Sequence, residues 1–270
     1  MKTRILAALV LVPVLLVVLL LAPTYVAAAV VGLMCGIASY ELLYRTGLVK
    51  NWWLNVCSAL MAFGVSVWSY FGAPYAAALI GIFLYMIVLF AQLLASGLQR
   101  KIQDLCVCLL SGVAVPFMLS ALVRIVVLPG GRCLIFIPFL MAFLSDTGAY
   151  FVGIFFGKHK LCPVISPKKT VEGFVGGIVT AVAGMLVFGL IMERYFLFEV
   201  NYLLAFVYGL FGSVAGVMGD LSMSVIKRQT GIKDYGNLIP GHGGILDRFD
   251  SVMITAPLTE ALLLLIPFMV

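Results

Sequence analysis

The densest group of ionisable residues in the chain lies between Asp220 and Asp250. Its candidate site residues are Asp220, Asp247, Asp250, Lys227, Arg228, Lys233, Arg248 and His242. Asp247 and Asp250 are three residues apart, so on a helix they share one face. Carboxylates from separate segments suit Mg²⁺, which commonly keeps one or two protein carboxylates and takes other oxygens from substrate phosphates. The pattern predicts a site for a metal-bound polyphosphate, with a simple interfacial loop as the alternative.

His242 lies in a glycine-rich turn inside this segment. The turn reads Pro240-Gly241-His242-Gly243-Gly244. Glycines let a backbone approach a ligand closely, because they carry no Cβ atom. Three roles stay open for His242: a hydrogen-bond donor to phosphate, an acid or base, and a structural hydrogen bonder.

Asp146 is an acid inside an apolar run, in the stretch Ser145-Asp146-Thr147-Gly148-Ala149-Tyr150. An aspartate at the centre of a membrane helix costs about 2.5–3.5 kcal/mol on insertion scales, so a functional role is the default interpretation. The neighbouring hydroxyl groups could hydrogen-bond the carboxylate or line a polar cavity. The alternative is a structural acid that these hydroxyl groups satisfy.

Two other acids in apolar runs are less informative. Glu41 precedes Arg45 by four residues, and an ion pair on one helix face explains it adequately. Glu260 lies inside the last apolar run and could be a buried hydrogen-bonding group or a cavity residue.

A second basic segment, Ser166-Pro167-Lys168-Lys169-Thr170, is expected to open a helix. Proline fits the first helical turn, and serine or threonine fits the cap. Lysines there oppose the positive end of the helix dipole unless an anion is present. Lys168, Lys169 and Thr170 are therefore candidate phosphate-binding residues, and a topology signal alone is the alternative.

The elements that must position these residues are membrane helices. The chain is 64% hydrophobic and 10% charged, whereas soluble domains carry roughly 25% charged residues. We expect nine spans, at about 5–21, 25–43, 54–71, 75–95, 105–123, 133–157, 173–192, 201–219 and 251–270. All should be helices, because lipid offers the backbone no hydrogen-bond partners. The first run also resembles a signal peptide, but its length favours a retained helix.

The predicted fold is an all-α integral membrane protein with a bundle of about nine transmembrane helices. The chain is expected to form a single polytopic membrane domain, with N-terminal helices in residues 1–132 and the catalytic helices and loops in residues 133–270. Small residues such as Gly209, Gly212, Gly216 and Gly219 predict close helix packing in the second part.

The basic residues predict how the chain crosses the membrane. With the N-terminus in the cytoplasm, all 17 except Arg124, Arg132 and Arg194 lie in cytoplasmic segments. Basic residues favour cytoplasmic loops, so both polar segments, residues 158–172 and 220–250, should face the cytoplasm. The net charge of +6 is thereby explained by topology, and a nucleic-acid partner is not expected.

The longest motif resembles the signature of phosphatidate cytidylyltransferases, the CDP-diacylglycerol synthases. It reads Ser224-x-Ile226-Lys227-Arg228, four residues, Lys233-Asp234-x-Gly236, two residues, then Ile239-Pro240-x-His242-Gly243-Gly244-Ile245-x-Asp247-Arg248-Phe249-Asp250. The stretches at Ser145–Tyr150 and Ile165–Gly173 also resemble family segments. Strong similarity covers about residues 140–255, whereas the earlier part is similar only in being hydrophobic.

This resemblance implies a CTP- and Mg²⁺-dependent enzyme in the bacterial inner membrane that makes CDP-diacylglycerol and pyrophosphate from CTP and phosphatidate. We assign the metal to Asp220 and Asp247, and substrate phosphate to Lys168, Lys169, Thr170 and Arg248. The catalytic candidates are Asp146, Lys227, Arg228, Lys233, His242 and Asp250. A homodimer is an open option. The alternatives are a CTP-using lipid kinase and a transporter in which Asp146 and Glu260 line an ion path.

Overall fold

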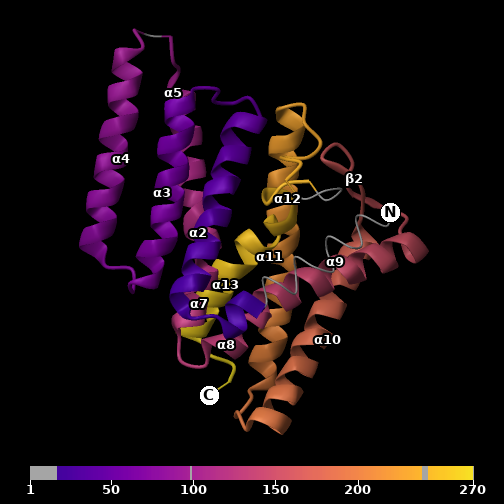
Figure 1. The fold of residues 1–270 in the computed structure, drawn as a ribbon. Coiled ribbons are helices and arrows are strands. Elements are labelled where there is room, and N and C mark those ends of the chain that lie inside the picture. The colour runs from indigo at the N-terminus through magenta and orange to yellow at the C-terminus, as the bar shows by residue number, and fades with distance from the viewer. Residues whose placement is uncertain (1–16, 98, 239–242, 270) are drawn as a thin grey trace. The chain divides into compact units, whose positions relative to one another are not determined.

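The computed structural model describes residues 17–97, 99–238 and 243–269. The chain forms two compact units, each made of two stretches of sequence. Unit 1 comprises residues 1–133 and 229–248, and unit 2 comprises residues 134–228 and 249–270. Nearly all regular structure in the described part is helical, with one two-stranded hairpin (Figure 1).

Unit 1 contains the helices of the first half of the chain. They are α2 (Thr24–Tyr40), the π-helix η1 (Glu41–Arg45), α3 (Trp52–Tyr70), α4 (Tyr75–Ala95), α5 (Ile102–Leu109), the π-helix η2 (Leu110–Ala114), α6 (Val115–Leu119) and α7 (Ala121–Val127), with α8 (Gly131–Leu134) at the boundary. The π-helix η1 continues α2 without a break. The helices α2, α3 and α4 run side by side (Figure 1).

Buried polar contacts connect these apolar helices. The hydroxyl of Ser66 on α3 donates to the carbonyl of Ala28 on α2 at 2.9 Å. The Tyr85 hydroxyl on α4 lies 2.7 Å from that of Ser58 and donates to the carbonyl of Cys108 at 3.0 Å. In lipid, hydrogen bonds of this kind satisfy polar groups that have no water available. They fix α3, α4 and α5 around a shared core that includes Leu54.

Unit 2 holds the remaining membrane helices and the hairpin. Its elements are α9 (Phe136–Phe156), β1 (Lys160–Cys162), β2 (Ser166–Thr170), α10 (Val171–Phe196), α11 (Tyr202–Gln229) and α13 (Val252–Leu265). The short helix α12 (Leu246–Phe249) spans the boundary between the units. The hairpin pairs Lys160 with Thr170 and Cys162 with Ser166 in antiparallel register.

Glycines let α9 and α10 pack closely. An added Cβ atom at Gly177 would lie 2.7 Å from the backbone oxygen of Ser145, and one at Gly173 would lie 2.7 Å from that of Ala149. The hydroxyl of Thr180 donates across the same interface to the carbonyl of Leu144 at 2.9 Å. Small residues permit this approach, as the sequence predicts for membrane helices.

The glycine face of α11 is also a packing face. A Cβ atom at Gly209 would approach the backbone of Val182 on α10 to 2.6 Å. At Gly219 it would overlap the carbonyl oxygen of Asp250, next to Ser251. This close approach holds the Asp220 region of α11 against the start of α13, because no side chain separates the two backbones.

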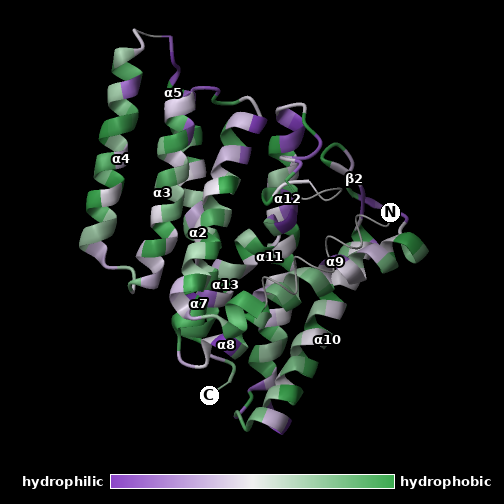
Figure 2. Cartoon of the chain, viewed as in Figure 1, coloured by the Kyte–Doolittle hydropathy of each residue, from purple (hydrophilic) through white to green (hydrophobic). Residues whose placement is uncertain are grey.

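Seven helical segments in the described part are long and apolar enough to cross a membrane. They are Thr24–Arg45, Trp52–Tyr70, Tyr75–Ala95, Ile102–Val127, Gly131–Phe156, Val171–Phe196 and Tyr202–Gln229, and Val252–Leu265 is a shorter apolar helix. Hydrophobic residues follow helices such as α4 along their length (Figure 2). These eight correspond to the second to ninth predicted spans and confirm an all-α membrane protein. The predicted span 5–21 lies largely outside the described residues.

Two local predictions were wrong. Residues 166–170 form strand β2 and do not begin a helix, because they pair with β1. Pro167 is tolerated there, since each strand of a two-stranded hairpin has one free edge. The helix begins at Val171, after Thr170 caps it. The predicted span 201–219 is the first part of a longer helix, since α11 continues to Gln229. Asp220, Lys227 and Arg228 are therefore helical residues and not part of a loop.

Candidate active site

An ion pair lies at the centre of the charged cluster in unit 2. The ammonium of Lys169 on β2 lies 2.5 Å from the carboxylate of Asp220 on α11. Each side chain is about three-quarters buried, with 21% and 25% of its surface exposed. Asp146 on α9 lies within electrostatic range of both groups. Three segments that are distant in sequence thus bring charged side chains together.

Asp146 lies on α9, and a serine at the start of α13 contacts its carboxylate. The hydroxyl of Ser251 donates to its carboxylate at 3.4 Å. The adjacent Ser145 hydroxyl is buried and lies 2.7 Å from the hydroxyl of Ser213 on α11. The carboxylate of Asp146 therefore extends from α9 toward the start of α13. It has polar neighbours, although α9 is an apolar helix.

Asp250 is a third acid of this cluster and follows α12 directly. It accepts a hydrogen bond from the backbone N–H of Ser251 at 2.8 Å. Burial, followed by the nearby charge of Asp220, raises the pKa of Asp250, and Lys227 opposes that shift. Desolvation and a like charge both penalise the ionised form. A bound cation would remove this penalty.

The hairpin presents the second basic segment. Thr170 accepts a hydrogen bond from the N–H of Gly173 at 3.1 Å and so caps α10. Glu172, in the first turn of α10, accepts from the backbone N–H groups of Lys158 and His159 at 3.0 and 3.2 Å. These contacts fix the strand that carries the exposed Lys168 and the largely buried Lys169.

The end of α11 is connected to the same hairpin. The Arg228 guanidinium donates from Nε to the carbonyl of Ile165 at 3.2 Å. Lys227 lies two helical turns beyond Asp220 on one face of α11 and is close enough to Asp250 to affect its titration. Of the predicted site residues, unit 2 thus brings together Asp146, Lys169, Asp220, Lys227 and Asp250, and it places Arg228 beside the strand that carries Lys168 and Thr170.

Asp247 lies in unit 1, where its carboxylate holds the preceding loop. Its Oδ2 atom accepts from the backbone N–H groups of Tyr235 at 2.7 Å and Gly244 at 2.9 Å. Gly243 has φ +83°, a conformation that glycine adopts readily, and a Cβ atom there would lie 2.6 Å from the same carboxylate oxygen. Sharing of one ion between Asp247 and Asp220, which belongs to unit 2, stays a prediction.

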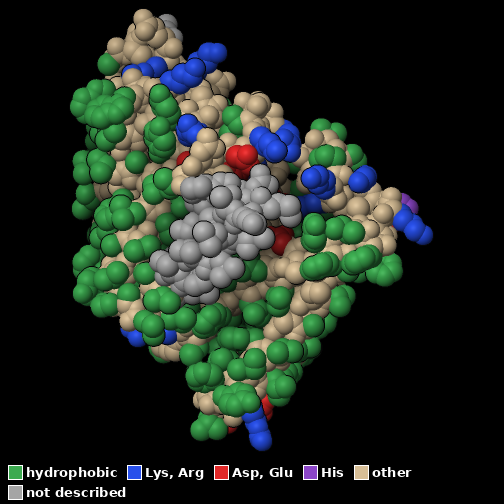
Figure 3. Space-filling view, turned by 45° about the vertical axis from the view of Figure 1, so that its right-hand side comes forward, with side chains coloured by type: hydrophobic (Ala, Val, Ile, Leu, Met, Phe, Trp, Pro, Cys, Tyr) green, Lys and Arg blue, Asp and Glu red, His purple; other side chains and the backbone are tan. Residues whose placement is uncertain are grey.

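Two other predicted residues of unit 1, Lys233 and Arg248, are exposed, so their side chains are accessible to an anion in solution. His242 lies outside the described residues, and its role stays a prediction. In Figure 3 the Lys and Arg side chains form small separate groups on a face that is largely hydrophobic.

The carboxylates of unit 2 fit a Mg²⁺ ion that also binds substrate. In the described ranges, no three His, Cys, Asp or Glu residues are grouped closely enough to enclose a metal. Asp220 and Asp250 are nevertheless two acids whose charges interact. Mg²⁺ commonly uses one or two carboxylates and completes its coordination with water and substrate phosphates. The donor set therefore suits a cation that arrives with a polyphosphate.

Two residues of the site were missed or misassigned in the sequence. Ser251 contacts Asp146, and only its position beside Asp250 could have indicated this. Glu41 was expected to pair with Arg45, which is wrong: the described residues contain no such ion pair. The Glu41 carboxylate instead accepts from the backbone N–H groups of Ile245 and Leu246, both at 3.0 Å. The sequence feature that could have indicated this role is the position of Glu41 inside an apolar run.

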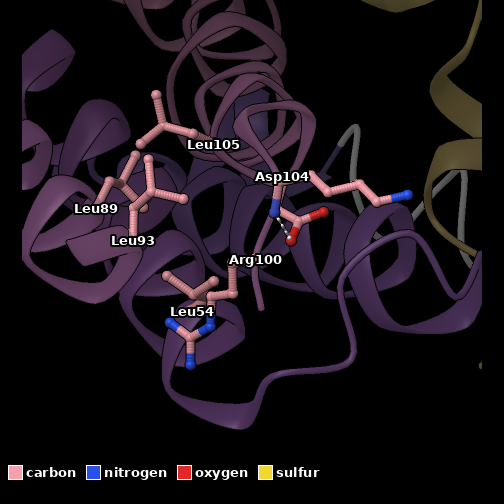
Figure 4. A pocket seen from close by; sticks show the side chains of 7 residues that line it. Leu54, Leu89, Leu93, Arg100, Asp104 and Leu105 are labelled. Carbon is pink, nitrogen blue, oxygen red and sulfur yellow. Dashed lines mark hydrogen bonds between the residues drawn. The ribbon is translucent and has the colours of Figure 1, made fainter. Parts of the chain in front are cut away.

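A small pocket in unit 1 lies where α5 begins (Figure 4). Leu54, Leu89, Leu93 and Leu105 line it, and the Asp104 carboxylate beside it accepts from the backbone N–H of Lys101 at 3.3 Å. Its volume is about 10 Å³, which is the space of about one water molecule. It is too small for a nucleotide, so we assign it no role in substrate binding.

Known proteins resemble this chain at two levels, a family model that matches nearly all of it and individual relatives that match about half of it. The model of the family described as "Cytidylyltransferase family" matches residues 2–266. The chain is 48% identical over 130 residues to a phosphatidate cytidylyltransferase of Staphylococcus saprophyticus, which is 48% of each chain. It is 47% identical over 135 residues to that of Staphylococcus epidermidis, which is 50% of each chain. In these alignments the chain spans about half the length of the curated relatives it matches.

Proposed function

The chain belongs to the cytidylyltransferase family, as its motifs indicate, and from this premise we propose that it transfers the cytidylyl group of CTP to phosphatidate. The products are CDP-diacylglycerol and pyrophosphate. Curated relatives with about 48% identity in the aligned half carry the name phosphatidate cytidylyltransferase, which supports this choice of substrates.

The observation that carries the proposal is the contact of Lys169 with Asp220 beside Asp146 and Asp250. A basic group and several acids at one place suit a substrate that is both anionic and cation-bound. The ammonium can pair with phosphate, while the carboxylates can attract the cation that accompanies the triphosphate.

The reaction needs positioning more than proton transfer. A phosphate oxygen of phosphatidate attacks the α-phosphorus of CTP, and the bond from that phosphorus to the oxygen bridging to the β-phosphate breaks. Pyrophosphate leaves with the bonding electrons. The attacking phosphate is already an anion, so no strong base is required. Lys169, Lys227 and Arg228 would stabilise negative charge and hold the phosphates in line.

Mg²⁺ is part of this proposal, with Asp220 and Asp250 of unit 2 as residues that would hold it, while the assignment of Asp247 to the metal stays a prediction from the sequence. When bound, the ion would supply neutralisation of phosphate charge. Asp146, whose carboxylate accepts from Ser251, would add a second negative charge near Asp220. The Lys169 ammonium alone would then not neutralise the acids, and a cation could still bind.

We also propose that the site faces the cytoplasm of a bacterial plasma membrane. The bias of basic residues toward one side supports this orientation. CTP is a cytoplasmic nucleotide, so the same side is required by the substrate. Homodimer formation stays an open prediction, which light scattering of the detergent-solubilised protein would test.

The test uses CTP labelled in parallel at the α- or the γ-phosphate. Purified protein in detergent receives phosphatidate, Mg²⁺ and each CTP preparation. We expect α-label in a lipid that also carries cytidine, and γ-label only in pyrophosphate. Transfer of γ-label to the lipid would identify a CTP-dependent lipid kinase instead. Absence of label from every lipid would reject both enzymes and direct attention to transport.

A further inference from the structure

Glu41 is a buried acid that the proposed chemistry does not use. Only 2% of its surface is exposed. Its two carboxylate oxygens accept from consecutive backbone N–H groups, those of Ile245 and Leu246, each at 3.0 Å. These N–H groups lie where α12 begins, and the first turn of a helix has no internal partners for them. Glu41 therefore satisfies the start of α12 from a segment more than 200 residues away in sequence.

The helix geometry changes where Glu41 lies. Residues Glu41–Arg45 form a π-helix at the end of α2, in which the hydrogen bonds run from i to i+5. Arg45 is exposed, whereas the Glu41 carboxylate is buried against the backbone of Ile245 and Leu246. Single π-turns inside α-helices are frequent at functional sites.

Two glycines, Gly236 and Gly244, leave room for the Glu41 carboxylate. A Cβ atom at Gly236 would lie 2.6 Å from Oε1 of Glu41. At Gly244 it would overlap both carboxylate oxygens. Any other residue at these two positions would displace the carboxylate or the loop, because the glycines provide the space that it occupies.

Asp247 completes the same arrangement from inside the loop. It accepts from the N–H groups of Tyr235 and Gly244, while Glu41 accepts from those of the next two residues, Ile245 and Leu246. Three consecutive N–H groups are thus bound by two carboxylates. Both are in unit 1, so this network is a property of one compact unit.

We propose that Glu41 is a positioning residue that fixes the start of α12 and thereby the directions of Asp247 and Arg248. The catalytic consequence rests on the proposed function, because Asp247 and Arg248 are the sequence-predicted residues for its cation and its substrate phosphate. Glu41 itself touches no substrate. Outer residues that orient ligands of a site typically change activity by about 10–100-fold when replaced.

The first experiment replaces Glu41 without changing its size. In Glu41→Gln one backbone N–H faces the amide NH₂ group in place of an acceptor oxygen. We expect hydrogen–deuterium exchange in peptides covering 243–249 to accelerate, with peptides from α2 and α3 unchanged. We also expect kcat/KM for CTP to fall about 10–100-fold. Asp104→Asn is the matched control, because that carboxylate also accepts a backbone N–H at a helix start. Its exchange in 243–249 and its activity should match the unmodified protein.

A second variant keeps the test decisive if Glu41→Gln does not fold. Gly244→Ala adds a methyl group against the Glu41 carboxylate and should cause the same local exchange and loss of activity. Gly64→Ala is its control, since a Cβ atom there has nothing within 4 Å. In the double variant the two effects should be less than additive, because both act through one contact.

The outcomes separate the positioning role from plain stability. Faster exchange across all of unit 1, in step with a lower melting temperature, would reject positioning in favour of general destabilisation. Unchanged exchange in 243–249 in both variants would reject the contact, and faster local exchange with full activity would reject its role in catalysis. If the unmodified protein makes no CDP-lipid, the proposed function fails, and the exchange data still accept or reject the contact.

Discussion

The ammonium of Lys169 and the carboxylate of Asp220 are 2.5 Å apart, which pairs a strand residue with a helix residue in unit 2. Without substrate, each charge compensates the other. A triphosphate with its cation offers both a better partner: phosphate for the ammonium and the metal for the carboxylate. We therefore interpret the pair as a preformed site that exchanges partners on binding.

The first prediction concerns this pair. Lys169→Met should lower kcat/KM for CTP by about 10²–10³-fold, the range seen when one stabilising group is lost from an active site. Asp220→Asn should have a loss of similar size, because the charge that attracts the cation is removed. Steady-state kinetics in detergent, with the labelled-CTP assay, measures both.

Lys160→Met is the matched control for Lys169→Met, since Lys160 is an exposed lysine on the paired strand β1. It should keep near-normal kinetics. Equal losses at Lys160 and Lys169 would show that the hairpin contributes only general positive charge, and the specific role of the ion pair would be rejected.

The second prediction is the pH dependence that follows from Asp250. Burial and the nearby Asp220 raise its pKa above the ordinary value of about 4. At pH below that ordinary value the carboxyl is protonated in the folded and unfolded states, and its contribution to stability is fully present. As pH rises through the raised pKa, a buried carboxyl must ionise and the contribution is lost. The melting temperature in EDTA should therefore fall with rising pH across this window.

Asp250→Asn tests the assignment, because an amide does not titrate. The fall in melting temperature should become shallower in this variant. Mg²⁺ should also reduce the fall in the unmodified protein, since a cation favours the ionised form. An identical pH profile in the variant would show that another group causes the dependence.

The third prediction concerns the packing that places Asp146. In Gly177→Ala, the new methyl group would lie 2.7 Å from the backbone oxygen of Ser145, which cannot rotate away. The two helices α9 and α10 must separate slightly, at a cost of about 1–3 kcal/mol, which is typical of overpacking. Thermal unfolding in detergent measures the loss of stability.

Gly81→Ala provides the comparison on another membrane helix. The nearest atom to a Cβ there is the Met61 methyl group at 3.9 Å, so stability should stay nearly unchanged. If both variants melted at the temperature of the unmodified protein, close packing would not be what holds α9 and α10.

Much of this fold and site could be predicted from the sequence. Apolar runs identify the spans because lipid requires helices of a definite length, and Asp146 is recognisable because a carboxylate in such a run is costly. The glycine face of α11 was likewise informative, since Gly219 packs against Asp250. These features follow from the hydrophobicity and the size of individual side chains, and both properties can be read from a single sequence.

Other features depend on tertiary contacts that the sequence does not display. Glu41 and Arg45 have helical i, i+4 spacing, but the Glu41 carboxylate accepts from the N–H groups of Ile245 and Leu246, which lie more than 200 residues away in sequence. Strand β2 (Ser166–Thr170) carries a helix-start pattern, which its pairing with β1 overrides. The charged residues after Gly219 mark the end of the apolar run but not the end of α11, which continues to Gln229. A helix can pass from lipid into water without a break, because its backbone hydrogen bonds are internal.

The last prediction is the orientation of the chain, which rests on the distribution of its basic residues. Gln229 ends α11 beside Lys227 and Arg228, so it should face the cytoplasm, whereas Glu199, between α10 and α11, should face the other side. Both are exposed, so cysteines there can react. In a background without the six native cysteines, a membrane-impermeant maleimide should label Glu199→Cys in intact cells, and Gln229→Cys only after permeabilisation. Labelling of Gln229→Cys in intact cells would reverse the orientation. The charged cluster would then face a compartment without CTP, and the proposed reaction could not occur there.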